Sequence, residues 1–113
     1  ALVHGDSIIS YDELLKRVDR VTKSLINEGV QVESIVALMM DRSIDMIVAI
    51  LAIQKAGGAY LPIDSSYPKE RVEYLLEDSA CGFLLTNFKE INDLNYSGNI
   101  LKFTKLENQN IKP

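Results

Sequence analysis

The sequence predicts an α/β fold: a Rossmann-like parallel half-sheet in three layers that follows an N-terminal β-hairpin. The segment KAGGAYLPID, Lys55–Asp64, is the clearest evidence, because two glycines stop a helix and a short extended run follows them. A near-continuous apolar segment, Ile44–Ile53, leads into it, and Pro68 lies where the next helix starts. Helix, strand and helix in this order are typical of a parallel sheet.

Two short strands and an amphipathic helix open the chain. Leu2–His4 and Ile8–Ser10 flank a Gly5-Asp6 turn of the type found in hairpins. Ser10 and Glu13 then have the spacing of a capping box, in which each side chain bonds the amide of the other residue at the start of a helix. Apolar residues recur at helical spacing after this cap, which predicts a helix lying on a sheet.

Three segments predict the parallel core of the sheet. Ile35–Met40 is apolar on both alternating faces, as expected of a strand that is covered above and below. Ala59–Ile63 and Gly82–Thr86 are the other two strands. The helices Ile44–Ala56 and Pro68–Glu77 would make the right-handed crossovers between them.

The helix Ile44–Ala56 has hardly any polar side chains. A helix that is apolar all round is a buried helix, and one layer of sheet covers only part of its circumference. We therefore expect it to be the most buried element of the chain. Its far side should be covered by a further part of the domain or by a second copy of the chain in a homo-oligomer.

The pattern weakens after Asn87. Ile100–Phe103 predicts one more short strand, and residues 104–113 are expected to be a frayed tail. Residues 1–113 would then form one partial domain. The chain starts at Ala1, without Met and directly in a strand, which favours a piece of a longer protein.

Composition argues against several classes of function. The net charge of the 113 residues is −4 and the basic residues are scattered, so nucleic acid is not an expected partner. The longest apolar run, Met46–Ile53, is far shorter than the ~18 residues of a membrane span. Cys81 is the only cysteine and His4 the only histidine, so neither a disulfide framework nor a Cys/His metal site is expected. With no secretory signal, these features favour the cytoplasm.

Residues of catalytic type are each better explained by structural roles. Gly57-Gly58 lies where a helix ends, whereas a phosphate loop leads from a strand into a helix. Asp41 and Asp64 each follow a predicted strand, where α/β sheets place ligand groups. A response-regulator receiver domain has its phospho-accepting aspartate in such a position, but it also has an acidic pair after its first strand and a lysine after its last strand. Both are missing here, so loop and turn roles are favoured for Asp41 and Asp64. The remaining candidates are expected to be packing residues: Cys81, Tyr60 and Tyr67.

Three motifs follow one another in an informative order. They are ISYDEL at Ile9–Leu14, the segment Asp41–Asp64, and YPKERVEYLLEDSACGFLLT at Tyr67–Thr86. The first two resemble core motifs of the adenylation domains of nonribosomal peptide synthetases, with Gln54 where that family usually has leucine, and the third resembles the usual continuation. The resemblance covers residues 1–90. Its Tyr-Pro-x-x-Arg and Leu-Glu-Asp-Ser sequences favour amino-acid-activating members over acyl-CoA synthetases.

The resemblance implies part of the N-terminal subdomain of an adenylation domain. Members of the family form an aminoacyl-AMP from ATP, Mg²⁺ and an amino acid and release pyrophosphate. They then load the acyl group on the phosphopantetheine thiol of a carrier domain, beside condensation domains. The family's phosphate loop, ribose-binding aspartate, amino-acid pocket and catalytic lysine match no position here. We therefore expect no catalytic, cofactor-binding or metal-binding residue in this chain, and no adenylation activity from it alone.

Two interpretations of the whole chain stay open. It is a fragment of an amino-acid-activating enzyme, or it is a non-enzymatic α/β module that self-associates or docks on a partner through its apolar helix. The coding sequence after Pro113 would separate them, because a Ser/Thr/Gly-rich loop ending in Gly-Lys would establish the fragment. The residues that select the amino acid in the family match no position here, so the resemblance implies no particular substrate.

Overall fold

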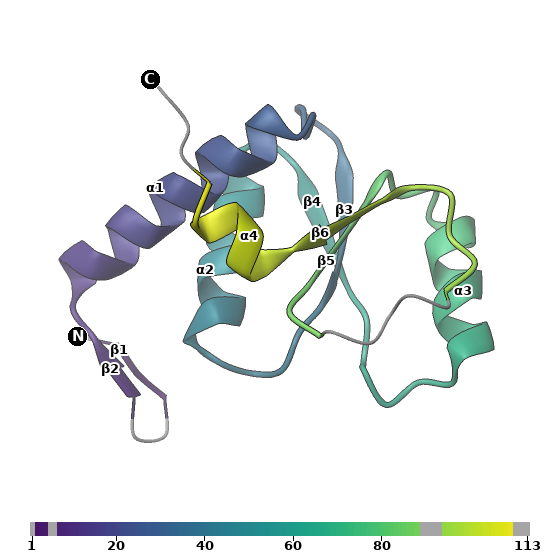
Figure 1. Cartoon of the computed structure of the whole chain (residues 1–113), viewed down its shortest axis with the longest axis horizontal. Helices are drawn as coiled ribbons and strands as arrows, with labels where there is room; N and C mark the ends of the chain where they lie inside the picture. Colours follow the sequence, from purple (N-terminus) through teal and green to yellow (C-terminus); the bar gives the residue numbers. More distant parts are fainter. Residues whose placement is uncertain (1, 5–6, 89–93, 110–113) are drawn as a thin grey trace.

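A computed structural model describes residues 2–4, 7–88 and 94–109. The helices are α1 (Tyr11–Asn27), α2 (Ile44–Lys55), α3 (Lys69–Asp78) and α4 (Phe103–Glu107). The strands are β1 (Leu2–His4), β2 (Ser7–Ile9), β3 (Ile35–Met39), β4 (Ala59–Pro62), β5 (Phe83–Thr86) and β6 (Asn99–Lys102). The main sheet lies between two layers of helices, one made of α1, α2 and α4 and the other of α3 (Figure 1). The predicted three-layer α/β fold is confirmed.

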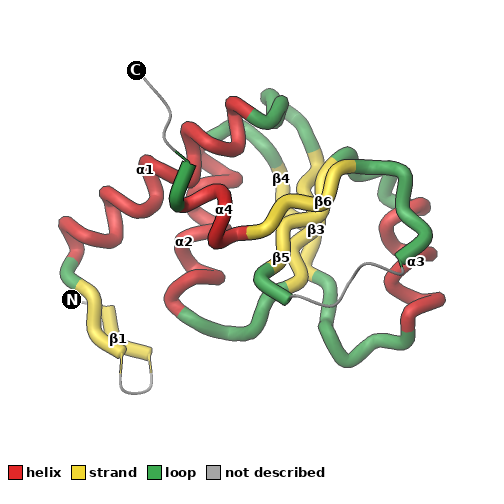
Figure 2. Tube along the Cα trace, in the orientation of Figure 1, coloured by secondary structure: helices red, strands yellow, loops and turns green. Residues whose placement is uncertain are grey.

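The main sheet is parallel and has the strand order β4-β3-β5-β6 (Figure 2). In β3, Val36 is in register with Tyr60 on one side and with Phe83 on the other. The predicted strands 35–40, 59–63 and 82–86 are confirmed to within one residue at one end. The strand predicted at 100–103 lies one residue earlier.

The N-terminal hairpin and α1 follow the sequence prediction, except that β2 lies one residue earlier than the predicted 8–10. β1 and β2 pair antiparallel, with Val3 opposite Ile8, while the predicted Gly5-Asp6 turn lies outside the described residues. The hydroxyl of Ser10 accepts a hydrogen bond of 3.1 Å from the amide of Glu13 and so caps α1. The buried residues of α1 are Leu14, Val18, Val21, Thr22, Ser24 and Leu25.

Helix α2 packs beside α1 on the same face of the sheet (Figure 1). Its cap is Ser43, whose hydroxyl accepts a bond of 3.2 Å from the amide of Met46. The buried residues of α2 are Ile44, Val48, Ala49, Ala52 and Ile53. The other apolar side chains form what we call the outer face of α2: Met46, Ile47 and Ile50, which are half-buried, and Leu51, which is exposed.

The expectation that this helix is the most buried element is wrong. All residues of β3 after Ile35 are buried, and so are those of β5 after Phe83. These two strands have neighbours on both edges and helices on both faces, whereas α2 contacts the rest of the fold along one side. Both the sheet and α1 cover α2. More of α2 is therefore buried within this chain than a single layer of sheet would bury.

The turn after α2 depends on two glycines. Gly57 has a φ of +90°, a conformation that costs other residues conformational energy. A Cβ atom on Gly58 would lie 2.9 Å from the backbone oxygen of Ser34, so the two segments approach each other through the missing side chain. The amide of Ala59 donates to the same oxygen at 2.8 Å. The predicted role of Gly57-Gly58 as helix-end and turn residues is confirmed.

The opposite face of the sheet is covered by α3. Its Val72 and Leu76 are buried in a cluster that contains Ala37, Met39 and Leu84 of the sheet. The helix begins one residue later than predicted. Pro68 is the N-cap, with an extended ψ of 152°, rather than the first helical residue.

The frayed tail expected over 104–113 is wrong for its first part. α4 occupies Phe103–Glu107, and both Phe103 and Leu106 are 2% exposed. The hydroxyl of Ser24 on α1 donates to the backbone oxygen of Leu106 at 2.6 Å. Tertiary contacts with α1 therefore hold a helix of five residues, which is too short to produce a recognisable apolar period on its own. Residues 110–113 lie outside the described part of the chain.

Candidate functional site

The carboxyl ends of the parallel strands form the edge at which open α/β sheets place ligands. The chain runs from β3 outward to β4 and then back across β3 to β5, so the strand order reverses between β3 and β5. The loops after β3, β4 and β5 meet at this edge. Asp41 and Asp64 lie in the first two of these loops, at the positions that the sequence predicts.

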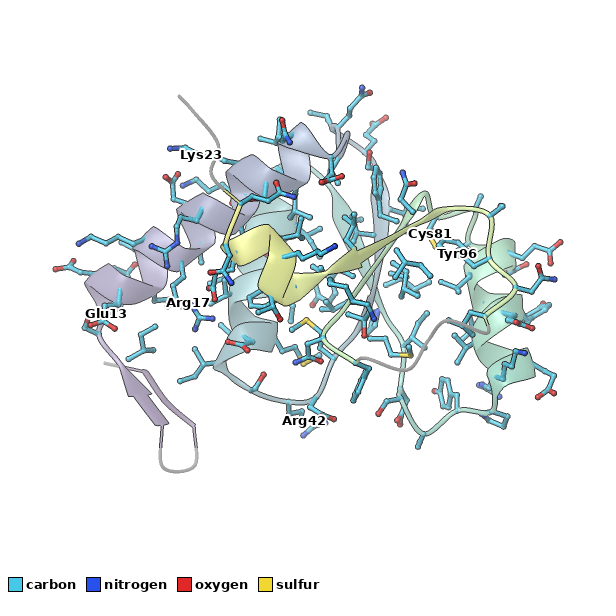
Figure 3. All side chains as sticks on the ribbon, in the orientation of Figure 1. Glu13, Arg17, Lys23, Arg42, Cys81 and Tyr96 are labelled. Carbon is cyan, nitrogen blue, oxygen red and sulfur yellow. The ribbon has the colours of Figure 1, made fainter. Side chains whose placement is uncertain are left out.

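A cleft of about 400 Å³ lies between the loops that follow β3 and β4. It is lined by Met40, Asp41, Arg42, Met46, Pro62, Ile63, Asp64, Ser65 and Tyr67. Figure 3 shows Arg42 on the loop that leaves β3. The cleft brings together three residues considered in the sequence, Asp41, Asp64 and Tyr67.

The carboxylate of Asp64 organises its own turn. Its Oδ1 accepts hydrogen bonds from the amide of Ser66 at 2.9 Å and from the hydroxyl of Ser66 at 2.8 Å. These bonds, with a smaller contribution from the charge of Arg42, lower the pKa of Asp64 below its ordinary value. The predicted turn role of Asp64 is confirmed, and the group is anionic at neutral pH.

The Tyr-Pro-x-x-Arg sequence has a structural explanation. The guanidinium carbon of Arg71 lies 4.5 Å from the centroid of the Tyr67 ring, in the range of a cation–π contact. The contact joins the loop before α3 to the first turn of that helix. The spacing of four residues therefore places the arginine in the first turn of α3, against the ring of Tyr67, which lines the cleft.

The cleft does not fit a nucleoside triphosphate such as ATP. A phosphate site needs backbone amides or cations directed at the anion, but two carboxylates, Asp41 and Asp64, face this cleft beside Arg42. Within residues 2–4, 7–88 and 94–109, no three His, Cys, Asp or Glu side chains are grouped so that they could hold a metal ion. None of the helices in these ranges is long and apolar enough to cross a membrane.

A second cleft of about 440 Å³ lies between α3 and the segment before β6. Here the Tyr96 hydroxyl donates to the backbone oxygen of Cys81 at 2.8 Å and lies 3.6 Å from the Cys81 Sγ (Figure 3). Burial, with the hydrogen bond to Cys81, raises the pKa of Tyr96 above its ordinary value. Cys81 is buried and packs with α3, as predicted. Sequence reasoning missed Tyr96, because its partner is fifteen positions away.

The other candidates do not join a site. Tyr60 lies on β4 and is 37% exposed, so the packing role expected of it is wrong, and His4 lies in β1, apart from the main sheet. Asn87, which follows β5, has a buried side-chain oxygen without a hydrogen bond to the described residues. Sequence reasoning missed it as well, since one asparagine after a strand is typical of a loop.

Comparison with known proteins decides the family. The family of AMP-binding enzymes matches residues 1–112. The chain belongs to this family. It is 46% identical over 111 residues to one of the plipastatin synthase proteins of Bacillus subtilis and 44% identical over 107 residues to one of the linear gramicidin synthase proteins of Brevibacillus parabrevis. These matches cover 98% and 95% of this chain but only 4% and 2% of the two relatives. The resemblance to peptide synthetases that the motifs indicate is confirmed.

Solved structures of AMP-binding enzymes agree with this assignment. The nonribosomal peptide synthetase FmoA3, in a form bound to α-methyl-L-serine-AMP, is 30% identical and superposes with a TM-score of 0.86 over 98% of this chain and 13% of FmoA3. The N-terminal subdomain of NpsA from Klebsiella oxytoca has the same fold, with a TM-score of 0.87, and this chain covers 29% of it. The described residues thus have the fold of one part of the N-terminal subdomain of an adenylation domain.

Proposed function

We propose that the chain is part of the N-terminal subdomain of an amino-acid-activating adenylation domain. The parent protein would convert ATP and an amino acid into an aminoacyl-AMP and pyrophosphate, and then transfer the acyl group to the phosphopantetheine thiol of a carrier domain. The observation that carries this proposal is the identity of 46% to a peptide synthetase over nearly the whole chain. The Tyr67–Arg71 contact adds a structural reason for one of the motifs that favour amino-acid-activating members.

The chain alone is proposed to be inactive. Transfer of an adenylyl group needs cations and donors that stabilise phosphate charge, whereas the cleft at the carboxyl edge has Asp41 and Asp64 on its walls. In the parent, ATP and Mg²⁺ would be held by residues outside these 113. Its partners would be the rest of the adenylation domain and the neighbouring carrier and condensation domains, and we place the protein in the cytoplasm.

The test is amino-acid-dependent exchange of pyrophosphate into ATP. We expect exchange from the complete adenylation domain that contains residues 1–113, and none above background from the purified 113-residue chain. Calorimetry should detect ATP binding to the complete domain only. Exchange by the short chain would refute its inactivity, and a complete domain that exchanges with no amino acid would refute amino acid activation.

A second candidate function is an interaction module. The outer face of α2 favours it, because its four apolar side chains are only partly covered by the described part of the chain. In the isolated chain this face would be covered by a second copy. The two proposals are compatible, since an adenylation fragment would self-associate through a surface that the complete domain covers internally.

A further inference from the structure

We propose that Asn87 is a positioning residue of the adenylation domain: its Oδ1 accepts a hydrogen bond from an N–H group outside residues 1–113 and holds that group at the carboxyl edge of the sheet. This inference rests on the proposed function, because the rest of an adenylation domain supplies the donor. The observation that carries it is that Asn87 Oδ1 is buried and has no hydrogen-bond partner in the described part of the chain. An amide oxygen buried without a donor destabilises a fold, so such a group in a native protein needs an explanation.

Asn87 directly follows β5, which lies beside β3 in the sheet (Figure 2). Met39 of β3 is in register with Thr86 of β5, so Asn87 comes level with the start of the loop after β3. The chain leaves β3 through α2 on one face of the sheet, whereas Phe88 after β5 packs with α3 on the other face. Open α/β sheets bind ligands in the crevice at such a divergence. The oxygen without a partner therefore lies where this kind of fold uses its polar groups.

The backbone on both sides of Asn87 is held in place. Thr86 is fully buried, and its Oγ1 accepts a hydrogen bond of 3.1 Å from the amide of Phe88. The backbone oxygen of Phe88 accepts a bond of 2.5 Å from Nζ of Lys102 on β6. These bonds fix the turn that carries Asn87. An acceptor on a fixed turn can hold its donor without a further loss of backbone entropy.

The second buried oxygen without a partner in the described residues, Oε1 of Gln109, has a different setting. Nε2 of the same side chain donates to Glu28 at 2.9 Å, and Gln109 follows α4 on the face of α1. Gln109 therefore connects two helices by its other amide atom, away from the carboxyl edge. This contrast leaves Asn87 as the residue whose oxygen calls for a donor at the ligand-binding edge.

The surroundings of Asn87 favour a neutral donor. The ammonium group of Lys102 is bound at the adjacent residue, Phe88, and it disfavours a second cation there. A main-chain amide is the neutral donor that a protein supplies at every residue except proline. This chain covers 29% of the NpsA subdomain that shares its fold, so most of such a subdomain lies outside these residues and can supply the amide.

Asn87→Leu should have opposite effects on the stability of two proteins. In the isolated 113-residue chain it removes an oxygen that has no donor, so the thermal midpoint should rise by about 4–8 °C. In the complete adenylation domain, free of ATP and amino acid, it leaves a buried N–H without its acceptor, so the midpoint should fall by about 2–4 °C. Asn27→Leu is the matched control, since Asn27 at the end of α1 is exposed and its replacement should change neither midpoint. A change of the same sign in both proteins would overturn the inference, because a water molecule or a donor within the chain would be lost from both.

The kinetics of pyrophosphate exchange by the complete domain test the positioning role. Asn87→Leu should lower kcat/KM on the order of 10-fold, because the group held by the oxygen lies at the ligand-binding edge. Asn87→Asp keeps the oxygen and removes the N–H groups of the side chain, so it should restore most of the activity. Unchanged kinetics in Asn87→Leu, or an equal loss in both variants, would refute the positioning role. An unsubstituted domain that exchanges pyrophosphate with no amino acid loses the proposed function, whereas the signs of the two midpoint changes still decide whether Asn87 has a donor.

Discussion

Arg17 on α1 and Glu107 on α4 are joined by two parallel hydrogen bonds across ninety positions of the sequence. Nε of Arg17 donates to Oε2 of Glu107 at 2.5 Å, and Nη2 donates to Oε1 at 3.1 Å. The same Nη2 reaches Asp45 in the first turn of α2 at 2.5 Å. The guanidinium carbon also lies 5.9 Å from the ring centroid of Phe103. One side chain thus connects the three helices on this face of the sheet (Figure 3).

Arg17→Met should lower the free energy of unfolding by about 2 kcal/mol, between the ~0.2–1 kcal/mol of an exposed ion pair and the ~3–5 kcal/mol lost when one partner of a buried pair is removed. The side chains of Arg17 and Glu107 are each 20% exposed, and the substitution leaves the Glu107 carboxylate without its partner. Urea denaturation measures the change. Lys23→Met is the control, because Lys23 pairs with Asp19 on the exposed surface of α1 and its loss should leave the midpoint unchanged. Equal midpoints for the two variants would contradict the prediction.

Gly58→Ala should destabilise the fold by about 2 kcal/mol, within the ~1–3 kcal/mol range of overpacking. The added Cβ would lie 2.9 Å from the backbone oxygen of Ser34, and that oxygen is held in place by the Ala59 amide. Gly82→Ala is the matched control, since a Cβ there meets no atom within 4 Å. It should be neutral or raise stability by ~0.4–1 kcal/mol through the unfolded state. Thermal denaturation of both variants tests this, and a Gly58→Ala midpoint at or above that of Gly82→Ala would refute it.

Tyr96→Phe should lower the free energy of unfolding by about 1 kcal/mol, since it leaves the backbone oxygen of Cys81 without its donor. It should also change the response to alkali. The folded state raises the pKa of Tyr96 above the ordinary value of 10.0, so above that pH the unfolded chain releases its proton more readily than the folded one. The contribution of Tyr96 to the free energy of unfolding is therefore complete below about pH 10 and declines as the pH rises above that value.

The free energies of unfolding of the unsubstituted chain and of Tyr96→Phe, measured between about pH 8 and pH 11, test this prediction. The unsubstituted chain should lose stability more steeply than Tyr96→Phe above pH 10.0. The two proteins differ only at position 96, so the difference between the two curves isolates Tyr96. Parallel curves would show that the folded state does not protect this hydroxyl.

Local sequence signals predicted most of the fold. The strands β3 and β5 are continuous apolar runs, and the ends of α1 and α2 are set by residues that act on their nearest neighbours, such as Ser10, Ser43 and Gly57. Such contacts are visible in a window of a few residues. The parallel pairing of the strands also followed, because strands joined through helices need right-handed crossovers.

The parts that the sequence did not predict depend on contacts between distant positions. Helix α4 is held by Ser24 and Arg17, which lie more than eighty residues away, and its own five residues carry no period. The Tyr96–Cys81 contact and the second cleft have the same origin. The positions of Asp41 and Asp64 after their strands were predicted, whereas the hydrogen bonds of Asp64 and the ring contact of Tyr67 are visible only in the structure.

The outer face of α2 gives the last prediction. Leu51 is 38% exposed, and Met46, Ile47 and Ile50 beside it are half-buried. Contiguous apolar surface on a small chain favours association, so the isolated 113-residue chain should self-associate as its concentration rises. Leu51→Glu should shift it to monomer, because a second copy would bury an unpaired charge. We prefer Leu51 to Ile50 for this test because Ile50 packs against the core, and a charge there would also affect folding.

Sedimentation velocity over a range of concentrations measures this association. Tyr74→Glu is the matched control, since Tyr74 is 64% exposed on α3, in the helix layer on the opposite face of the sheet. Tyr74→Glu should sediment like the unsubstituted chain, while Leu51→Glu should stay monomeric at every concentration. A parent chain that is monomeric at high concentration, or a Tyr74→Glu variant that dissociates as readily as Leu51→Glu, would remove the outer face of α2 as the site of contact.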